Sequence, residues 1–182
     1  MSKVRWGIIG TGSIANAFAH SIKHCNHSEL IAVFGRNKET LQTFSQKFDV
    51  AGINETDELV ASNVIDAIYI ATPHSSHFEY ALQAIKNNKH VLCEKPIAMN
   101  HIESMVLFGL AKDHGVFLME AYMYRTHPQT FNILKNIESL CDTNEKVEIN
   151  ASFGFHAEIP KDHRLRNPML GGGAIMDVGC YP

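Results

Sequence analysis

The chain has 182 residues, of which 45% are hydrophobic, and its formal net charge is -3. This hydrophobic content suffices for one sizeable core and excludes a disordered chain. Because the sequence has no Lys/Arg cluster, we expect no nucleic-acid partner and no membrane-surface partner. No apolar run reaches membrane-spanning length and the first predicted strand leaves no room for a signal peptide, so we expect a cytoplasmic protein.

The stretch from Val4 to Ala15 is typical of a strand that runs into a nucleotide-binding turn. Gly10 permits the tight turn, Gly12 lets the backbone approach a pyrophosphate, and Ala15 lets the next helix lie close to the sheet. The anion would lie at the amino terminus of a helix predicted over Ile14 to Ile22. The alternative is an ordinary strand-to-helix turn without a ligand. The predicted cofactor contacts here are Gly10, Thr11, Gly12, Ser13 and Ile14.

A second strand, Glu29 to Gly35, and a helix, Lys38 to Phe48, complete a βαβ unit. An acidic residue usually ends this strand and binds the ribose 2′-hydroxyl, but here Arg36 follows the strand. Its guanidinium suits a 2′-phosphate, which favours NADP(H) over NAD(H) as the cofactor. The alternative is a solvated loop arginine.

Strands and helices continue to alternate along the chain. The predicted elements are a strand over Ile65 to Ala71, a helix over Ser75 to Lys86, a strand over His90 to Cys93, a helix over Asn100 to His114 and a strand over Val116 to Met119. This pattern predicts a doubly wound parallel α/β sheet, in which residues after the strands' carboxyl ends face one crevice. We place Thr72, Pro73, His77, Glu94 and Lys95 among the cofactor contacts. For His77 we expect a place either at the rim of the crevice or at the amino terminus of the next helix.

The sequence pattern changes after Tyr122. A helix over Pro128 to Ile137 and a polar turn over Asp142 to Lys146 precede a strand with period-2 alternation over Val147 to Phe155. We therefore predict two domains, a dinucleotide-binding Rossmann domain over residues 1–122 and the beginning of an incomplete α+β domain over residues 123–182. The four cysteines are widely spaced, so we predict reduced thiols and no metal site.

Four motifs together resemble the glucose-fructose oxidoreductase, inositol dehydrogenase and rhizopine-catabolism family (Gfo/Idh/MocA). They are Gly10 to Ala15, Ala71-Thr72-Pro73, Glu94-Lys95-Pro96 and Gly171 to Pro182. The segment Glu120 to Pro128 is most similar to the branch of dihydrodiol and xylose dehydrogenases. The resemblance implies a Rossmann domain followed by an α/β domain that covers the active site.

The resemblance also implies roles for three residues. Lys95 matches the lysine beside the nicotinamide ribose and the substrate hydroxyl, and Asp177 matches the aspartate of the second-domain motif. Tyr181 stands where many members carry histidine, and in the glucose-fructose and dihydrodiol branches this tyrosine is the proposed proton donor. We predict Lys95, Tyr181 and Asp177 as catalytic.

Chemistry supports the same three residues independently. Moving a hydride between a carbinol and nicotinamide requires one group that takes or gives the hydroxyl proton. An ammonium beside a tyrosine favours the phenolate, so Lys95 and Tyr181 can work as a pair. Asp177, placed with Tyr181 on one helical turn, could orient the lysine or a substrate hydroxyl. Each residue also has a structural alternative: Lys95 could lie on the surface, Tyr181 could belong to the core, and Asp177 could be a charge at the start of a helix. Arg164 and Arg166 could bind a ligand or lie in solvent.

These observations predict an NADP(H)-dependent oxidoreductase that acts on a carbinol of a sugar or vicinal diol. The rival hypothesis is a truncated nucleotide-binding fragment without turnover, a pseudoenzyme or one part of a split enzyme. One predicted strand cannot form the second sheet, so we expect either a homo-oligomer or a missing C-terminal polypeptide as a partner.

Overall fold

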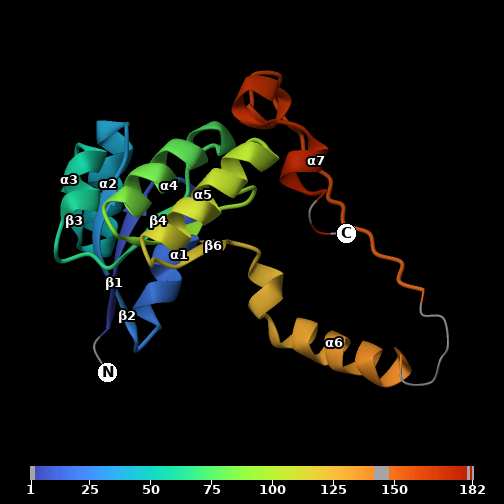
Figure 1. The fold of residues 1–182 in the computed structure, drawn as a ribbon. Coiled ribbons are helices and arrows are strands. Elements are labelled where there is room, and N and C mark those ends of the chain that lie inside the picture. Colours follow the sequence, from blue (N-terminus) through green and yellow to red (C-terminus); the bar gives the residue numbers. More distant parts are fainter. Residues whose placement is uncertain (1–2, 142–147, 180, 182) are drawn as a thin grey trace.

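The computed structural model describes residues 3–141, 148–179 and 181. Its centre is a sheet of six parallel strands in the order β3-β2-β1-β4-β5-β6 (Figure 1). The strands are β1 (Val4–Ile9), β2 (Ser28–Phe34), β3 (Ala51–Ile53), β4 (Ala67–Ile70), β5 (His90–Cys93) and β6 (Leu118–Glu120). From β1 the sheet continues through β2 to β3 on one side, and from β4 it continues through β5 to β6 on the other. This reversal confirms the predicted doubly wound Rossmann sheet.

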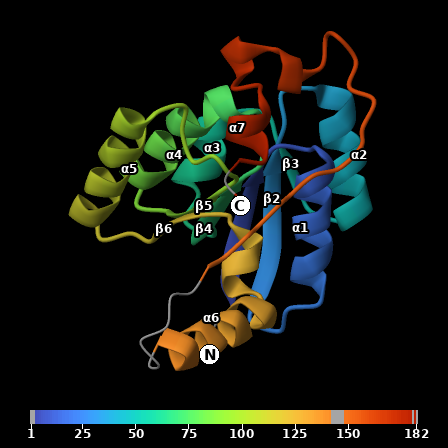
Figure 2. The ribbon, with the colours of Figure 1, turned by 90° about the vertical axis from the view of Figure 1, so that its right-hand side faces the viewer.

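Helices cover both faces of this sheet (Figure 2). On one face lie α1 (Ser13–Lys23) and α2 (Lys38–Phe48), and on the other lie α3 (Thr56–Ala61), α4 (His77–Lys86) and α5 (His101–Asp113). Right-handed crossovers explain this division, because the two halves of the sheet are built in opposite directions and so carry their helices on opposite faces. The loops after the strands are consequently gathered at one edge of the sheet.

Adjacent residues of the central strands belong to two separate cores. Ile8 of β1 packs in the cluster that contains Ala15 of α1, whereas Ile9 packs in the cluster that contains Ile70 and Ile85. Side chains alternate across a strand, so a strand buried on both faces needs a continuous apolar run. The apolar run before the glycine turn therefore fixes β1 in the middle of the sheet.

Most predicted elements of the first domain are confirmed with small shifts of their ends. The helix over Lys38–Phe48 and the strand over His90–Cys93 have the predicted bounds, whereas β4 is shorter than predicted. A short 3-10 turn, His74–Ser76, precedes α4. Sequence reasoning missed β3 and α3, which have three and six residues and are too short to give a periodic pattern.

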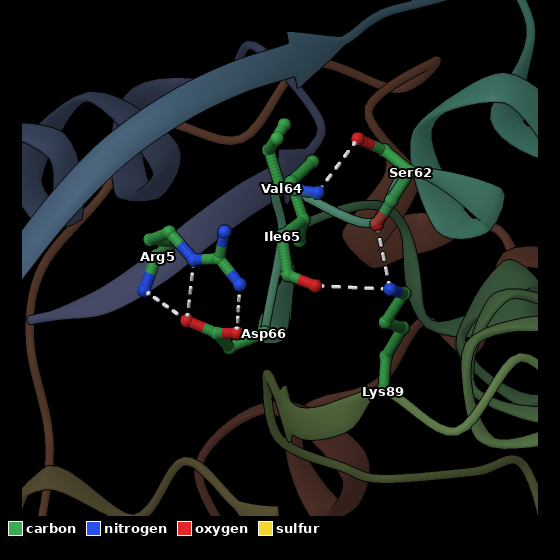
Figure 3. A network of polar contacts seen from close by, with 6 residues as sticks. All are labelled: Arg5, Ser62, Val64, Ile65, Asp66 and Lys89. Carbon is green, nitrogen blue, oxygen red and sulfur yellow. Dashed lines mark hydrogen bonds and ion pairs between the residues drawn. The ribbon is translucent and has the colours of Figure 1, made fainter. Parts of the chain in front are cut away.

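A polar cluster joins the amino-terminal ends of the central strands (Figure 3). Arg5 donates from its backbone nitrogen (2.9 Å), Nε (2.9 Å) and Nη2 (2.6 Å) to the Asp66 carboxylate. These bonds hold the pKa of Asp66 down at about 2. Lys89 is 8% exposed and donates to the carbonyls of Ser62 (2.6 Å) and Ile65 (2.9 Å). The cluster thus ties β1 to the segments that enter β4 and β5.

After Tyr122 the chain leaves the sheet through a 3-10 turn, η2 (Met123–Thr126), and enters α6 (Pro128–Cys141), which projects away from the Rossmann domain (Figure 1). This confirms the predicted helix and extends its carboxyl end. The turn predicted over Asp142–Lys146 lies outside the described residues. Neither α6 nor another helix in the described part of the chain combines the length and apolar character needed to cross a membrane.

The strand predicted over Val147–Phe155 is wrong for the residues that the structure describes. Residues 148–160 have no regular secondary structure, and the alternating apolar residues stay in solvent, with Ile149 68% and Phe153 51% exposed. A strand is stabilised by backbone hydrogen bonds to a neighbouring strand, and within the described residues none pairs with this segment. The alternation alone therefore does not produce a strand.

Three short helical segments, red in Figure 1, end the chain. They are η3 (Arg164–Arg166), η4 (Pro168–Leu170) and α7 (Ala174–Asp177). The prediction that Asp177 and Tyr181 share one helical turn is wrong, because α7 ends at Asp177 and Val178 has φ -127° and ψ -16°. Tyr181 instead donates its backbone N–H to the carbonyl of Val178 at 3.1 Å.

Candidate active site

The glycine turn after β1 is shaped by contact with the neighbouring strand. Gly10 has φ +121°, and a Cβ at this position would lie 2.4 Å from the carbonyl oxygen of Ala71. Only glycine satisfies both conditions, so Gly10 lets β1 and the end of β4 approach each other. Gly12, the residue before α1, has open space within 4 Å of its Cβ position. The first N–H groups of α1 thus face room for an anion.

A cavity of about 660 Å³ lies over this turn. Its volume is within the usual range of roughly 300–1,000 Å³ for small-molecule sites. The structure places eight of the predicted cofactor contacts in its lining: Gly10, Thr11, Gly12, Ser13, Ile14, Arg36, Thr72 and Pro73. They come from the turn after β1, the end of β2 and the loop after β4, which meet because all three strands run parallel.

Sequence reasoning missed several further residues of the cavity lining, and it left Arg164 open. The missed polar or aromatic ones are Phe34, Asn37, Thr40 and Tyr80. Asn37 carried a signal, since its side chain caps α2 by accepting hydrogen bonds from the backbone of Glu39 and Thr40, each at 3.0 Å. Tyr80 lies inside a helix and carried none.

The lining is polar on the side of β2 and contains no carboxylate among its described residues. Arg36 lies two residues after the end of β2, and the hydroxyls of Thr11 and Thr40 are hydrogen bonded at 2.9 Å. Thr11 occupies the space that a side chain at Gly35 would need, because a Cβ there would lie 2.7 Å from its Cγ2. This end of the cavity therefore offers cationic and hydroxyl groups in place of the usual ribose-binding acid.

His77 does not line this cavity, contrary to the prediction. It is completely buried, with Nδ1 2.7 Å from the Pro96 carbonyl and Nε2 2.8 Å from the Thr72 carbonyl. Burial lowers the pKa of His77, and the two carbonyls partly oppose that shift. His77 therefore joins the loop after β4 to the loop after β5, and so connects two loops that carry predicted site residues.

Lys95, which was also predicted as a cofactor contact, does not line the main cavity, and neither does Glu94. Its Oε1 accepts a hydrogen bond of 2.6 Å from the Tyr69 hydroxyl, and burial followed by this carboxylate raises the pKa of Tyr69. Both residues line a second, largely apolar cavity of about 340 Å³, to which Leu92 and Met119 contribute. Ile14 lines both cavities and thus lies at the boundary between them.

The three residues predicted to be catalytic come together although 86 positions separate the first from the last. Lys95 Nζ donates to the backbone carbonyl of Asp177 and lies 3.3 Å from its Oδ1, and both side chains are less than one-fifth exposed. The same Nζ lies 5.2 Å from the centroid of the Tyr181 ring. One ammonium group thus contacts a carboxylate and an aromatic face.

Tyr181 is held by other aromatic rings as well. Phe153 stacks on it with centroids 4.8 Å apart, and the Tyr124 ring lies 5.8 Å away. These rings come from three separate segments after the Rossmann domain. The segment that lacks a strand therefore still contributes one side chain next to the candidate proton donor.

Comparison with known proteins shows the family of this chain. The profile of the Gfo/Idh/MocA group, described as an oxidoreductase family with an NAD-binding Rossmann fold, matches residues 4–122. A D-xylose 1-dehydrogenase (NADP(+)) from Hypocrea jecorina is 34% identical over 98% of this chain and 51% of its own length. A trans-1,2-dihydrobenzene-1,2-diol dehydrogenase from Xenopus tropicalis is 34% identical over 97% of this chain and 54% of its own.

Among solved structures, a 3-ketoreductase from Actinomadura kijaniata, in complex with NADP and TDP-benzene, superposes on 100% of this chain and 55% of its own with a TM-score of 0.86 at 29% identity. The chain therefore spans about half the length of the relatives that it matches. The match to the dihydrodiol and xylose dehydrogenases confirms the branch that the sequence motifs indicated. The chain belongs to the Gfo/Idh/MocA oxidoreductase family.

Proposed function

We propose that this chain carries the cofactor site and the proton-handling residues of an NADP(H)-dependent oxidoreductase that acts on a carbinol of a sugar or vicinal diol. The observation that carries the proposal is the meeting of Lys95, Asp177 and Tyr181 at the end of the sheet where the glycine-turn cavity lies. A dinucleotide and a substrate hydroxyl need such neighbouring sites, one that binds phosphate and one that moves a proton.

The cavity fits a dinucleotide phosphate. The open space at Gly12 and the free N–H groups of α1 suit the pyrophosphate, and Gly10 keeps the turn close to the sheet. Arg36 would pair with a 2′-phosphate, and the absence of a carboxylate among the described lining residues removes the repulsion that a second phosphate would meet. These features support NADP(H), with NAD(H) as the less favoured alternative.

The bound nicotinamide supplies the hydride acceptor or donor. The chain's own residues would then handle the hydroxyl proton and orient the substrate. Tyr181 would exchange the proton through its hydroxyl, while the ammonium of Lys95 favours the phenolate. Asp177 holds Lys95 in place through its carbonyl and carboxylate. Lys95 therefore acts as the link between the Rossmann domain and the last segment of the chain.

The substrate class rests on the relatives. Two of them are named for D-xylose and for a dihydrodiol, and a third, from Bacillus subtilis, is named a scyllo-inositol 2-dehydrogenase (NADP(+)). All three names describe carbinols with a neighbouring hydroxyl. We extend this class to the present chain as a proposal, and we place the protein in the cytoplasm.

A panel of aldoses and cyclic diols, incubated with NADP+ or NAD+ and followed by absorbance of the reduced nicotinamide, tests the proposal. We expect dinucleotide binding that favours NADP(H). In a form of the protein that turns over a panel member, Lys95→Met should eliminate that turnover. Lys112→Met, on the exposed side of α5, is the matched control. Binding without turnover by any panel member would support the rival hypothesis of a nucleotide-binding chain without activity, and no dinucleotide binding would overturn both.

A further inference from the structure

Arg164 lies far from the Rossmann domain in sequence but lines the dinucleotide cavity. It belongs to η3, is partly buried, and borders the same cavity as the glycine turn and the loop that carries Thr72 and Pro73. Arg166, two positions further on, is exposed and absent from the lining. The two arginines of this turn therefore differ in a way that their sequence context does not reveal.

His74 fixes the direction of the Arg164 side chain. Arg164 Nη1 lies 3.3 Å from His74 Nε2, and His74 Nδ1 lies 2.9 Å from the carbonyl oxygen of Gly171. A guanidinium can only donate and a carbonyl can only accept, so His74 must be neutral, with its proton on Nδ1. Burial, Arg164, His77 and Lys95 all lower the pKa of His74, which agrees with this form.

Gly171 makes the close approach of this turn possible. It has φ +74°, and a Cβ there would lie 2.8 Å from the Cβ of His74 and 2.9 Å from the Sδ of Met99. A side chain would therefore push the turn away from His74 and move Arg164 with it. The segment from Arg164 to Gly171 is thus fitted to the loop after β4.

The charge of Arg164 lacks a carboxylate partner among the residues that the structure describes. An arginine that is partly buried without a carboxylate and lines the same cavity as the open space at Gly12 is well placed for an anion. The opening at Gly12 belongs to the same cavity, and Gly10 brings the glycine turn into contact with the end of β4, directly before the loop that holds His74. The pyrophosphate position is accordingly the part of the cofactor that faces this loop.

We propose that Arg164 contacts the dinucleotide pyrophosphate and that His74 is the residue that positions it. The inference rests on the proposed function, since it needs a dinucleotide in the cavity. It adds that cofactor binding draws the segment from Arg164 to Gly171 onto the Rossmann domain. The cofactor would then help to fix the last segment of the chain, which also carries Asp177 and Tyr181.

Affinities of Arg164→Met for NADPH and NADH, measured by fluorescence titration, test the contact. Because both dinucleotides have the pyrophosphate, we expect both to bind roughly ten- to a hundredfold more weakly, the loss typical of a charge-assisted hydrogen bond. Arg164→Lys should recover part of the affinity, and Arg166→Met, the matched control, should leave it unchanged. Weakening of NADPH alone would place Arg164 at the 2′-phosphate and overturn the proposal.

His74→Asn tests the positioning role, because the asparagine amide nitrogen can still donate to the Gly171 carbonyl, but the shorter side chain has no acceptor atom at the position of Nε2, which contacts Arg164. We expect weaker dinucleotide binding in the otherwise native chain and no further loss when His74→Asn is added to Arg164→Met. Equal losses in both backgrounds would show a purely structural effect and overturn the role of His74. Unchanged affinity in Arg164→Met overturns the contact alone, whereas a native chain that binds neither dinucleotide overturns the proposed function as well.

Discussion

Lys95 Nζ lies 3.3 Å from Asp177 Oδ1, and this ion pair joins the loop after β5 to the last helical turn of the chain. Both side chains are largely buried, at 14% and 16% exposure, so their contact is less screened than a surface pair. The pair brings the lysine of the Rossmann domain under the ring of Tyr181. In the proposed function, proton handling therefore depends on contacts between two parts of the chain.

Lys95→Met should lower turnover at least about a hundredfold, the lower range for loss of a positioned acid–base group. Dinucleotide affinity should stay within roughly tenfold, because the glycine turn and helix N–H groups hold the phosphates. Steady-state rates and titrations on the same samples separate the two effects. Asp177→Asn keeps the backbone carbonyl that accepts from Lys95, so it should lose less turnover than Lys95→Met. Activity that survives Lys95→Met would exclude Lys95 from proton handling.

Arg36→Ala should weaken NADPH binding by about 1.5 to 3 kcal/mol while leaving NADH binding nearly unchanged. Only the 2′-phosphate loses a charge-assisted partner in this variant. Lys38→Ala, at the exposed start of α2, controls for a general loss of positive charge. Equal weakening of both dinucleotides in a titration would remove Arg36 from the 2′-phosphate site.

Gly10→Ala and Gly12→Ala should separate folding from binding. At Gly10 a Cβ meets a backbone carbonyl and φ is +121°, so the variant should lose about 1 to 3 kcal/mol of unfolding free energy. At Gly12 the Cβ enters open space and φ is -73°, so stability should hold while the methyl group takes the room of a phosphate. Dinucleotide binding should then weaken roughly tenfold or more, about 1.4 kcal/mol. Urea unfolding and titration measure the two effects, and a stable Gly10→Ala chain would contradict the turn geometry.

Asp66→Asn should lower the unfolding free energy at neutral pH by about 0.2 to 1 kcal/mol, a modest amount because the carboxylate is 35% exposed. Arg5 depresses the pKa of Asp66 to about 2 in the folded state, against about 3.9 in model peptides. The ion pair therefore stabilises the fold above pH 4, and this contribution disappears as the pH falls toward 2. Urea unfolding at several pH values should show the native chain and the variant converging in that interval. Asp113→Asn, an exposed residue at the end of α5, should not reproduce this convergence.

The sequence was sufficient for the Rossmann sheet because its strands are apolar on both faces. Runs such as Ala67 to Ala71 are continuous, and the glycine turn fixes where the first strand ends. β3 was not predicted because three residues are too few to show an alternating hydrophobic pattern, and its place in the sheet is decided by pairing with β2. Length and apolar continuity were therefore the limits of prediction in this domain.

The residues after Tyr122 were harder to predict, for a different physical reason. The alternation from Val147 to Phe155 satisfies the strand pattern, but hydrogen bonds from a neighbouring strand decide whether a strand forms. Tyr181 reaches Lys95 although α7 ends early, since tertiary contacts and not helical spacing place it there. His77 begins α4, which is one of the two places predicted for it, whereas its burial depends on two loops that only the folded structure brings together.

The strand order separates the residue proposed to select the cofactor from the residue proposed to handle the proton. Arg36 follows β2 and Lys95 follows β5, with β1 and β4 between them in the sheet. Three inter-strand spacings of about 4.8 Å place the two strand ends roughly 14 Å apart. Groups that far apart with separate contacts usually behave independently under mutation. Substitutions after β2 should therefore be able to change the preference between NADP(H) and NAD(H) without changing the proton transfer proposed for the residues after β5.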